Sequence, residues 1–198
     1  MRQGNAQHQL KYESEYIVMN DLSVIQLMIR AIGEDPGREG LKETPKRVVK
    51  SWDTLYGGYE LDPKTVLDIT FDQPCDQMVI LKNIEFFSTC EHHMLPFFGQ
   101  AHIAYIPNGK VAGLSKLARL LEIFSRRLQI QEKLTNEVAD ALMKHLEPKG
   151  CGVVLDAKHF CMISRGVNKQ NSQMVTSALR GEFYEPEVRQ EFHRLAGI

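Results

Sequence analysis

One short run of the chain concentrates groups that bind metal ions. Cys90, Glu91, His92 and His93 are consecutive, which places a thiol, a carboxylate and two imidazoles within four positions. The spacing Cys90-x2-His93 is typical of metal chelation, and a third soft ligand from Cys161 would complete a Cys2His set, which suits zinc. Three protein ligands leave the fourth tetrahedral position for water, as in a catalytic rather than a structural zinc site.

Spacing alone leaves the choice of ligands open. His159 and Cys161 lie in a run, residues 151–163, that alternates like a β-strand, so we expect both to point to one face. His92, His93 and His159 could each reach a metal at the first cluster, and a site with four of these groups would be closed and structural. The competing interpretation is that the thiols are small buried groups and the histidines ordinary polar residues. We prefer a metal site because two Cys/His clusters occur in a chain with only four cysteines.

Composition excludes several classes of protein. A chain of 198 residues with 43% hydrophobic residues can bury one real core. A net charge of -1 argues against a general nucleic-acid binder, which needs a broad basic surface. The first fifteen residues lack the apolar core of a signal peptide, and the longest early apolar cluster, residues 24–29, is too short to span a bilayer. We therefore expect a cytoplasmic protein with reduced thiols and with no membrane or nucleic-acid partner.

The N-terminal part predicts two helices. Apolar residues at helical spacing indicate a first helix over residues 21–32. Thr44 is an N-cap residue followed by proline, and it indicates a second helix that ends at Gly57. This hairpin is too small for a core of its own, so we expect it to pack on the rest of the chain or on another subunit. The expected segments are a flexible arm (1–17), a helical hairpin with a linker (18–76) and a main catalytic domain (77–198).

The rest of the chain predicts two strands, two amphipathic helices and two more strands. The expected strands are 78–87, 99–106, 151–163 and 173–183, and the expected helices are 115–128 and 131–146, with a short C-terminal helix from residue 185. This order indicates an α+β fold, an antiparallel four-stranded sheet with two helices on one face. The open sheet edges and the uncovered face favour oligomerisation.

The start of the helix expected over 115–128 has the features of a phosphate site. Ser115 offers a hydroxyl, and Lys116 and Arg119 lie three residues apart on one helix face. Free backbone N–H groups and the helix dipole favour an anion there. Arg165, four residues after Cys161, could add a third cation. The alternative is a solvated basic face, and the signal gains weight only if this helix start faces the metal.

Four motifs together resemble the GTP cyclohydrolase I family over about residues 20–195. They are Ser-Thr-Cys-Glu-His-His at 88–93, Gly-Leu-Ser-Lys at 113–116, Arg-Arg-Leu-Gln-Ile-Gln-Glu-Lys-Leu-Thr at 126–135 and His-Phe-Cys at 159–161. The resemblance implies the tunnelling fold, in which sheets of several subunits join into a barrel, and a homodecamer of two pentamers with active sites between subunits. It also implies the conversion of GTP and water to formate and 7,8-dihydroneopterin triphosphate, the entry to tetrahydrofolate or tetrahydrobiopterin.

The resemblance also implies a role for individual residues. Its zinc ligands match Cys90, His93 and Cys161, and its catalytic histidines match His92 and His159. Its triphosphate-binding residues match Ser115, Lys116, Arg119 and Arg165, and its guanine-binding pair matches Gln131 and Glu132. Zinc would lower the pKa of a bound water toward about 7, and an imidazole that titrates near neutrality suits the proton transfers.

Two other interpretations stay open at this point. A tunnelling-fold nitrile reductase of queuosine synthesis would use a nucleophilic cysteine and a nicotinamide cofactor, and zinc content would separate it from the first interpretation. A non-catalytic zinc-stabilised interaction module would fold with metal but show no turnover. A nucleic-acid deaminase is disfavoured because its His-x-Glu and Pro-Cys-x-x-Cys motifs are absent. The pathway served, cooperativity and any regulatory partner are not indicated by the sequence.

Overall fold

The computed structural model describes residues 21–198. The chain divides after Thr54 into two compact units, and each is described by itself. The expected arm, residues 1–17, lies outside the described residues, and the expected limit at residue 76 stays a prediction. Within residues 21–198, no helix is both long enough and apolar enough to cross a membrane.

The first unit holds the first of the two expected helices and all but the last two residues of the second. Residues 21–31 form the first helix, in which Ile25 and Ile29, four positions apart, are buried. It ends before Gly33, whose φ of +91° suits a residue without a Cβ. The second helix, α2 (Thr44–Tyr56), has proline in its first turn, where the missing N–H costs no hydrogen bond.

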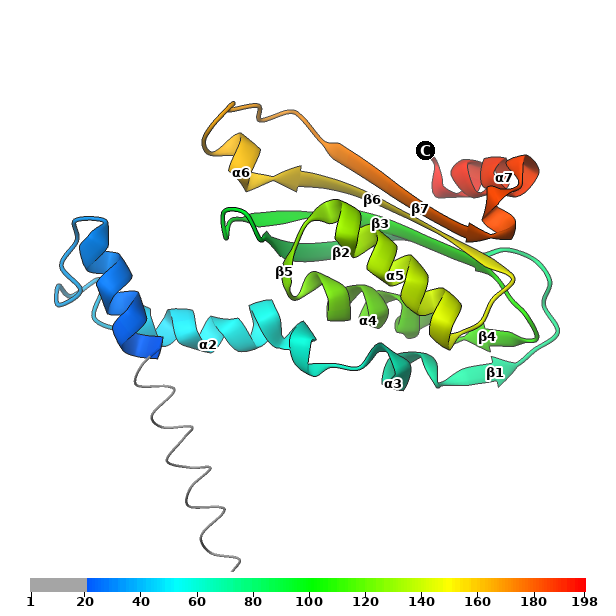
Figure 1. The fold of residues 1–198 in the computed structure, drawn as a ribbon, viewed down its shortest axis with the longest axis horizontal. Helices are drawn as coiled ribbons and strands as arrows, with labels where there is room; N and C mark the ends of the chain where they lie inside the picture. The colour runs from blue at the N-terminus through cyan, green and yellow to red at the C-terminus, as the bar shows by residue number, and fades with distance from the viewer. Residues whose placement is uncertain (1–20) are drawn as a thin grey trace, which may run out of the picture. The chain divides into compact units, whose positions relative to one another are not determined.

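The second unit is built on a five-stranded sheet in the order β5-β2-β3-β6-β7 (Figure 1). The four long strands are β2 (Val79–Cys90), β3 (Pro96–Ile106), β6 (Gly150–His159) and β7 (Met174–Gly181), and neighbours among them are antiparallel. The expected antiparallel four-stranded sheet is therefore confirmed. The added strand, β5 (Leu128–Gln129), is two residues long and runs parallel to the end of β2.

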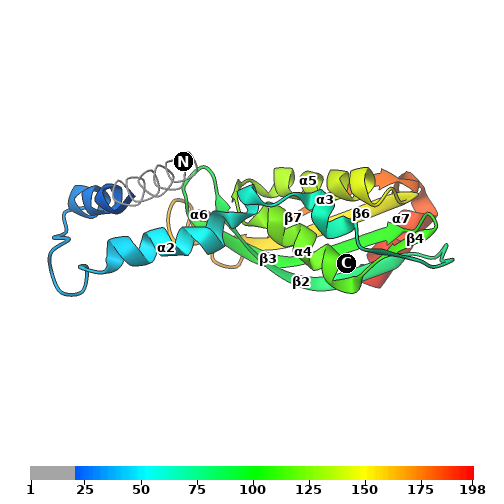
Figure 2. The same cartoon turned by 90° about the horizontal axis from the view of Figure 1, so that it is seen from below.

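Two helices cover one face of this sheet, as expected. They are α4 (Leu114–Ser125) and α5 (Gln131–His145), and Figures 1 and 2 show both on the same side. Their apolar stripes, with Leu120 and Leu134 among them, are fully buried against Ile103 and Tyr105 of β3. Each buried side chain of this size contributes about 1.5–3 kcal/mol. The order strand, strand, helix, helix, strand, strand is the tunnelling-fold layout.

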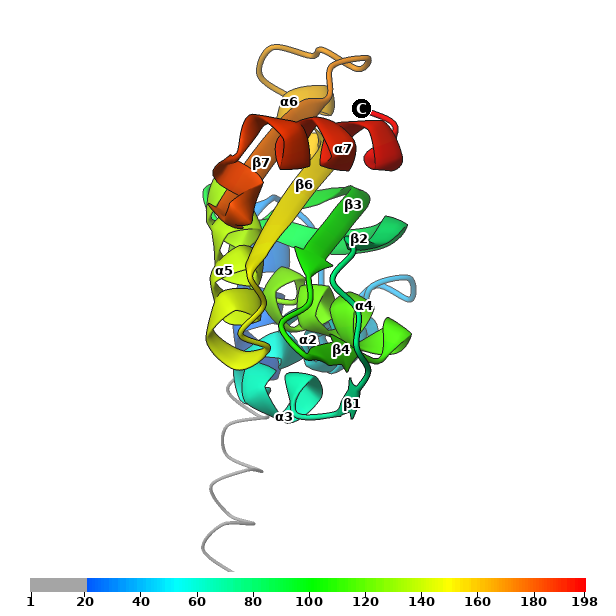
Figure 3. The same cartoon turned by 90° about the vertical axis from the view of Figure 1, so that its right-hand side faces the viewer.

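The opposite face of the sheet is covered at one end by α7 (Pro186–Ala196), which follows a short turn of 3-10 helix, Glu182–Tyr184 (Figure 3). Side chains alternate along β3, so Ala104 and Ile106 point to this second core while Ile103 points to the first. Gly152 makes room for it, because a Cβ there would lie 2.6 Å from the ring of Phe183.

Four short elements precede or flank the sheet. A turn of 3-10 helix, Gly57–Glu60, leads to α3 (Pro63–Leu67), while β1 (Thr70–Asp72) and β4 (Lys110–Ala112) pair with each other. Helix α3 was not predicted, although its signal is visible. Asp62 caps it by accepting a hydrogen bond from the Lys64 N–H at 2.9 Å, and proline follows directly.

The prediction that one strand continues to residue 163 was wrong. Strand β6 ends at His159, and residues Phe160–Ile163 form a short helix, α6. On one side, β7 begins opposite Ala157 and gives no partner beyond it. On the other side, the next partner on β3 would be Pro96, which has no N–H to donate. The strand therefore stops where its hydrogen-bond partners stop.

Candidate active site

The first Cys/His cluster forms the turn of the hairpin between β2 and β3. Cys90 is the last residue of β2, and its N–H donates to the carbonyl of Leu95 at 2.8 Å while its own carbonyl accepts from the Met94 N–H at 2.8 Å. Met94 has a φ of +53°, which lets the chain reverse within a few residues. The Cys90 side chain is buried below the turn, whereas His92 and His93 are exposed on it.

The third candidate ligand reaches this turn from the other hairpin. Cys161 lies in α6, directly after the strand neighbour of β3. The ligand atoms of Cys90, His93 and Cys161 all lie within 4.8 Å of one another. The Sγ of Cys90 is 3.9 Å from Nδ1 of His93. Two segments far apart in the sequence therefore place two sulfurs and one imidazole nitrogen around a common point.

The charge balance of these groups fits a cation. Burial and the neighbouring Cys90 thiol raise the pKa of Cys161, and a backbone hydrogen bond and the charge of Arg165 oppose this only in part. The Cys161 thiol therefore resists ionisation on its own. A divalent metal reverses this, because it binds the thiolates and favours their deprotonated form. The three groups fit a metal cofactor.

His159 occupies a more enclosed position beside this group. It ends β6 opposite Phe97 of β3, and the two rings stack with centroids 4.6 Å apart. Its Nε2 lies 2.8 Å from Oε1 of Gln131. Burial lowers the pKa of His159, and the charge of Glu132 partly opposes this.

The start of α5 is held next to the metal group by β5. Strand β5 pairs with Thr89 and Cys90, and the Glu91 N–H donates to the carbonyl of Gln129 at 3.0 Å. Two residues later, Gln131 is fully buried and Glu132 is exposed. The carboxylate of Glu132 has no hydrogen bond or ion pair within residues 21–198. The chain thus presents an unpaired carboxylate near His159.

The residues expected to bind phosphate do not all join this group within one chain. Arg165 does, since its charge acts on the Cys161 thiol. Helix α4 ends at Ser125, three residues before Leu128. Because Leu128 pairs with Thr89 at the end of β2, the C-terminal end of α4 is the one that lies near the hairpin turn. A twelve-residue helix is about 18 Å long. Ser115 and Lys116 therefore lie toward the far end of α4, beside β4 (Figure 1).

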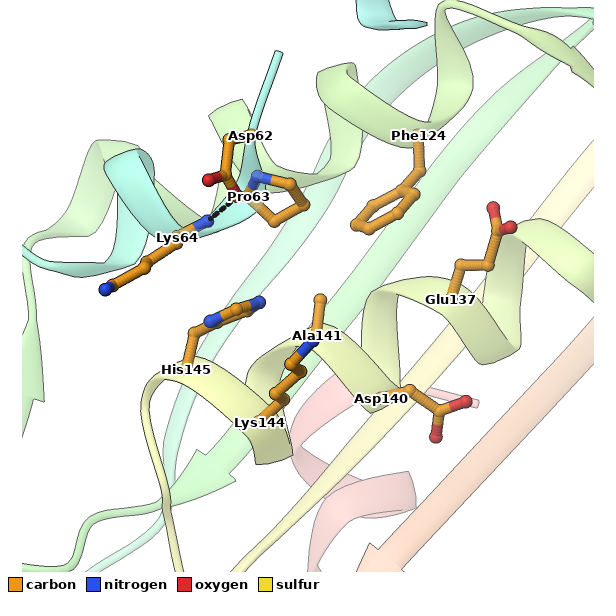
Figure 4. A pocket seen from close by; sticks show the side chains of 9 residues that line it. All are labelled: Asp62, Pro63, Lys64, Phe124, Glu137, Asp140, Ala141, Lys144 and His145. Atoms are coloured by element: carbon orange, nitrogen blue, oxygen red, sulfur yellow. Dashed lines mark hydrogen bonds between the residues drawn. The ribbon is translucent and has the colours of Figure 1, made fainter.

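A separate pocket lies between α3, α4 and α5 (Figure 4). None of the residues of the metal group lines it. Its carboxylates already have partners, because Glu137 accepts from Gln129 at 2.7 Å and Asp140 pairs with Arg180 at 2.8 Å. These groups fasten α5 to its neighbours, and we assign this pocket no part in the chemistry.

Three residues near the site were missed by reasoning from the sequence. Phe97 supplies the ring under His159, and Thr135 and Thr176 surround Gln131. The sequence carries a weak signal for Thr135, which lies four residues after Gln131 and therefore on the same helix face. Phe97 follows a proline at the start of a strand, where an aromatic residue is ordinary. Nothing in its own position marked it.

The fold and the site define an α+β enzyme with a thiol-imidazole metal group at the turn of a sheet hairpin. The family model of GTP cyclohydrolase I matches residues 22–197. The chain belongs to the GTP cyclohydrolase I family, and the resemblance expected from its motifs is confirmed.

Individual relatives agree with this family. A GTP cyclohydrolase 1 of Wolinella succinogenes is 58% identical over 182 residues, which cover 91% of this chain and 96% of that protein. The enzymes of that name from Chlorobium phaeovibrioides and Campylobacter lari are each 54% identical over 173 residues, 86% of this chain and 78% and 91% of theirs. Among solved structures, an apo archaeosine synthase QueF-Like has a TM-score of 0.44 and 16% identity, over 52% of this chain and 93% of that one.

Proposed function

We propose that this enzyme converts GTP and water to formate and 7,8-dihydroneopterin triphosphate, the first step of tetrahydrofolate or tetrahydrobiopterin synthesis. The observation that carries the proposal is the convergence of Cys90, His93 and Cys161 within 4.8 Å in a chain of this family. The reaction hydrolyses C–N bonds and rearranges a ribose, so it needs a metal and proton carriers but no redox cofactor.

Zinc is the metal that we assign to this site. Two thiolates and one imidazole are a soft, mixed set that zinc accepts in tetrahedral geometry, and three protein ligands leave one position open. When bound, zinc would act as a Lewis acid and lower the pKa of a coordinated water. Cys90 would hold it from the buried side, Cys161 from a half-buried position and His93 from the exposed turn.

His92 and His159 are proposed to carry protons. Imidazole suits this task because each ring has one nitrogen that donates and one that accepts, and because it titrates near neutrality. His92 stands next to a ligand, with its ring centroid 6.3 Å from that of His93. Its exposure leaves it open to a bound substrate.

Glu132 is proposed to read the guanine base. Guanine presents an N1–H and a 2-amino group side by side, and an ionised carboxylate only accepts, so one carboxylate pairs with both. The exposed, unpaired carboxylate at the start of α5 supports this role. Gln131, the other member of the expected guanine pair, is fully buried, and its side chain is engaged inside the chain.

We place the triphosphate site between subunits. The start of α4 and the metal group lie toward opposite ends of the same helix, so one chain alone does not assemble both parts of the site. The α4 start of a neighbouring copy would bring Ser115, Lys116 and Arg119, and Arg165 would act from the metal side. This arrangement agrees with the decamer of two pentamers implied by the resemblance.

Uncovered surfaces support such an assembly. Only two residues of β2 pair with β5, so the rest of that edge of β2 has no partner strand within the described residues. The outer edge of β7 has no partner strand there either. Near the metal group, the ring of Phe87 stacks on Phe98 at 5.8 Å and remains 50% exposed. Open edges and exposed aromatic rings favour pairing with other copies. Native mass spectrometry should show ten chains per particle.

The compartment follows from the ligands. Thiols that must hold a metal are kept reduced in the cytoplasm, whereas an oxidising compartment would favour a disulfide between neighbouring cysteines. We therefore place the enzyme in the cytoplasm.

Incubation of the purified protein with GTP tests the proposal. We expect pterin fluorescence after oxidation, together with one formate per GTP, and no product from ATP. Metal-dependent folding without product would identify a zinc-stabilised interaction module instead. Oxidation of a reduced nicotinamide cofactor by a nitrile substrate would identify the reductase.

A further inference from the structure

The side chain of Gln131 is enclosed at the start of α5 and has partners at both of its polar ends. It is 0% exposed. Its Nε2 lies 3.1 Å from the carbonyl oxygen of Leu155, 2.8 Å from that of Met174 and 3.1 Å from Oγ1 of Thr176. Its Oε1 lies 2.8 Å from Nε2 of His159. The amide therefore connects α5 to β6, to β7 and to a histidine beside the metal group.

The orientation of this amide follows from its partners. Backbone carbonyls only accept hydrogen bonds, so the amide nitrogen must face Leu155 and Met174, and the amide oxygen must face His159. The opposite orientation would set an oxygen against two carbonyl oxygens. The threonine hydroxyls agree with this orientation. Thr135 donates to the carbonyl of Gln131 at 2.6 Å, so Thr176 donates to Thr135 at 2.7 Å and accepts from the amide nitrogen.

The amide oxygen in turn determines which nitrogen of His159 carries the proton. A neutral imidazole has one N–H, and an oxygen acceptor at 2.8 Å requires that N–H on Nε2. Nδ1 then has a lone pair, and it makes no hydrogen bond within residues 21–198. The ring cannot turn over easily, because it lies 3° from parallel to the ring of Phe97 at 4.6 Å.

We propose that Gln131 is a positioning residue, whose side chain holds His159 with its proton on Nε2 and its lone pair on Nδ1, and that this side chain does not contact the guanine. The proposal rests on the proposed function, in which His159 carries a proton. Nδ1 is then the nitrogen of His159 that is open to the substrate. The side chain of Gln131 has no polar atom left for the base, because its two amide hydrogens already face three acceptors and its oxygen faces His159.

A purely structural role is the alternative. Gln131 could serve only to satisfy the carbonyls of Leu155 and Met174, in which case His159 would be indifferent to it. A direct contact to guanine is a second alternative. The three explanations differ in what the tautomer of His159 and the two kinetic constants should do when Gln131 is changed.

Nitrogen-15 magic-angle-spinning NMR on metal-loaded full-length enzyme with labelled histidine tests the tautomer. Spectra of a His159→Asn variant assign the His159 signals by difference. We expect a protonated Nε2 and an unprotonated Nδ1 in the wild type at a pH where the ring is neutral. A wild-type ring protonated on Nδ1, or a mixture of both tautomers, would overturn the proposal without any Gln131 variant, so the test survives if such variants do not fold.

Gln131→Met and Thr135→Val form a matched pair for the kinetics. Both disturb the buried network at the start of α5, but only the first removes the acceptor of His159. We expect Gln131→Met to mix the tautomers and to lower kcat about 10–100-fold, the usual cost of losing a partner that orients an active-site histidine, with little change in the KM for GTP. Thr135→Val should keep the tautomer and most of the kcat.

The outcomes separate the explanations. A Gln131→Met enzyme with raised KM and unchanged kcat would show that Gln131 binds the base, and equal effects of both variants on kcat would show a structural role. Either result overturns the proposal. If the wild type releases no formate from GTP, the proposed function fails, while the tautomer measurement still decides whether Gln131 orients His159.

Discussion

The imidazole of His159 lies flat on the ring of Phe97, with centroids 4.6 Å apart and planes 3° from parallel. The other proposed proton carrier, His92, is in a different setting. It is exposed on the hairpin turn, and its ring stands at 90° to that of His93. One histidine is therefore held by packing, whereas the other is exposed.

His92→Ser should retain the metal and lose turnover. Its side chain is not among the three ligands that converge, so elemental analysis should give the same metal content as the wild type. Turnover should fall by about 10²-fold or more, the usual scale for general acid-base catalysis. Loss of the metal in this variant would mean that His92, and not His93, is the ligand.

Arg119→Ala should weaken binding of the triphosphate. A charge-assisted contact of this kind contributes roughly 1.5–3 kcal/mol, so we expect the KM for GTP to rise at least about tenfold. Binding of guanosine, which has no phosphate, should change little and serves as the control. Equal weakening toward both ligands would indicate a disturbed α4 and not a lost phosphate contact.

Glu132→Gln should reduce the preference for GTP over ATP. The substitution replaces one carboxylate oxygen, an acceptor, by an amide group that donates toward the N1–H and 2-amino donors of guanine. Polar groups left unpaired in this way support discrimination between substrates of about 10⁴ or more. Inosine triphosphate lacks the 2-amino group and should bind the wild type with intermediate affinity. Lys133→Gln, a neutralised charge on the same turn of α5, is the control.

Competition binding on folded, metal-loaded protein measures this preference. If Glu132→Gln retains the wild-type ratio of GTP to ATP affinity, Glu132 acts only through the helix dipole and contributes about 0.3–1 kcal/mol to stability. The guanine would then be recognised by other residues.

Helices and their buried faces could be predicted from the sequence because their signal is periodic. Leu120 and Leu134 sit on apolar stripes, and both are fully buried where the stripes meet the sheet. The end of β6 could not be predicted in this way. It depends on Pro96 of β3 lying opposite Phe160, the residue after His159. That pairing is set by the register between the two strands and cannot be read from the sequence of either strand alone.

The same limit applies to the site. The metal group could be predicted because Cys90 and His93 carry their chemistry in their spacing, and Cys161 is a similar residue in a second cluster. The burial of Gln131 could not be predicted, because a polar residue in the first turn of a helix is ordinarily exposed. Its position follows from β5, a strand of two residues with no periodicity to detect.

Cys151 should make stability depend on pH in alkaline solution. Burial raises the pKa of its thiol from 9.0 to about 12, and its Sγ donates to the carbonyl of Ala139 at 3.5 Å. The pKa of the folded state thus lies above that of the unfolded state, so the contribution is complete below about pH 9 and is lost as the pH rises toward about 12.

Urea unfolding of the wild type and of Cys151→Ala, at equal chain concentration, measures this effect. Between about pH 8 and pH 10 the stability advantage of the wild type should shrink by about 1.4 kcal/mol, the free energy of one pH unit. A constant difference over this range would show that the thiol does not stay protonated in the folded state.

Removal and return of the metal tests the central claim most directly. The enzyme is treated with a chelator, and formate release from GTP is measured before treatment, after it, and after addition of one zinc ion per chain, with Cys161→Ser in parallel. We predict that activity disappears with the metal and returns with zinc in the wild type, and that Cys161→Ser recovers neither full metal content nor activity. Undiminished formate release from metal-free wild type, or full zinc occupancy in Cys161→Ser, would contradict the account.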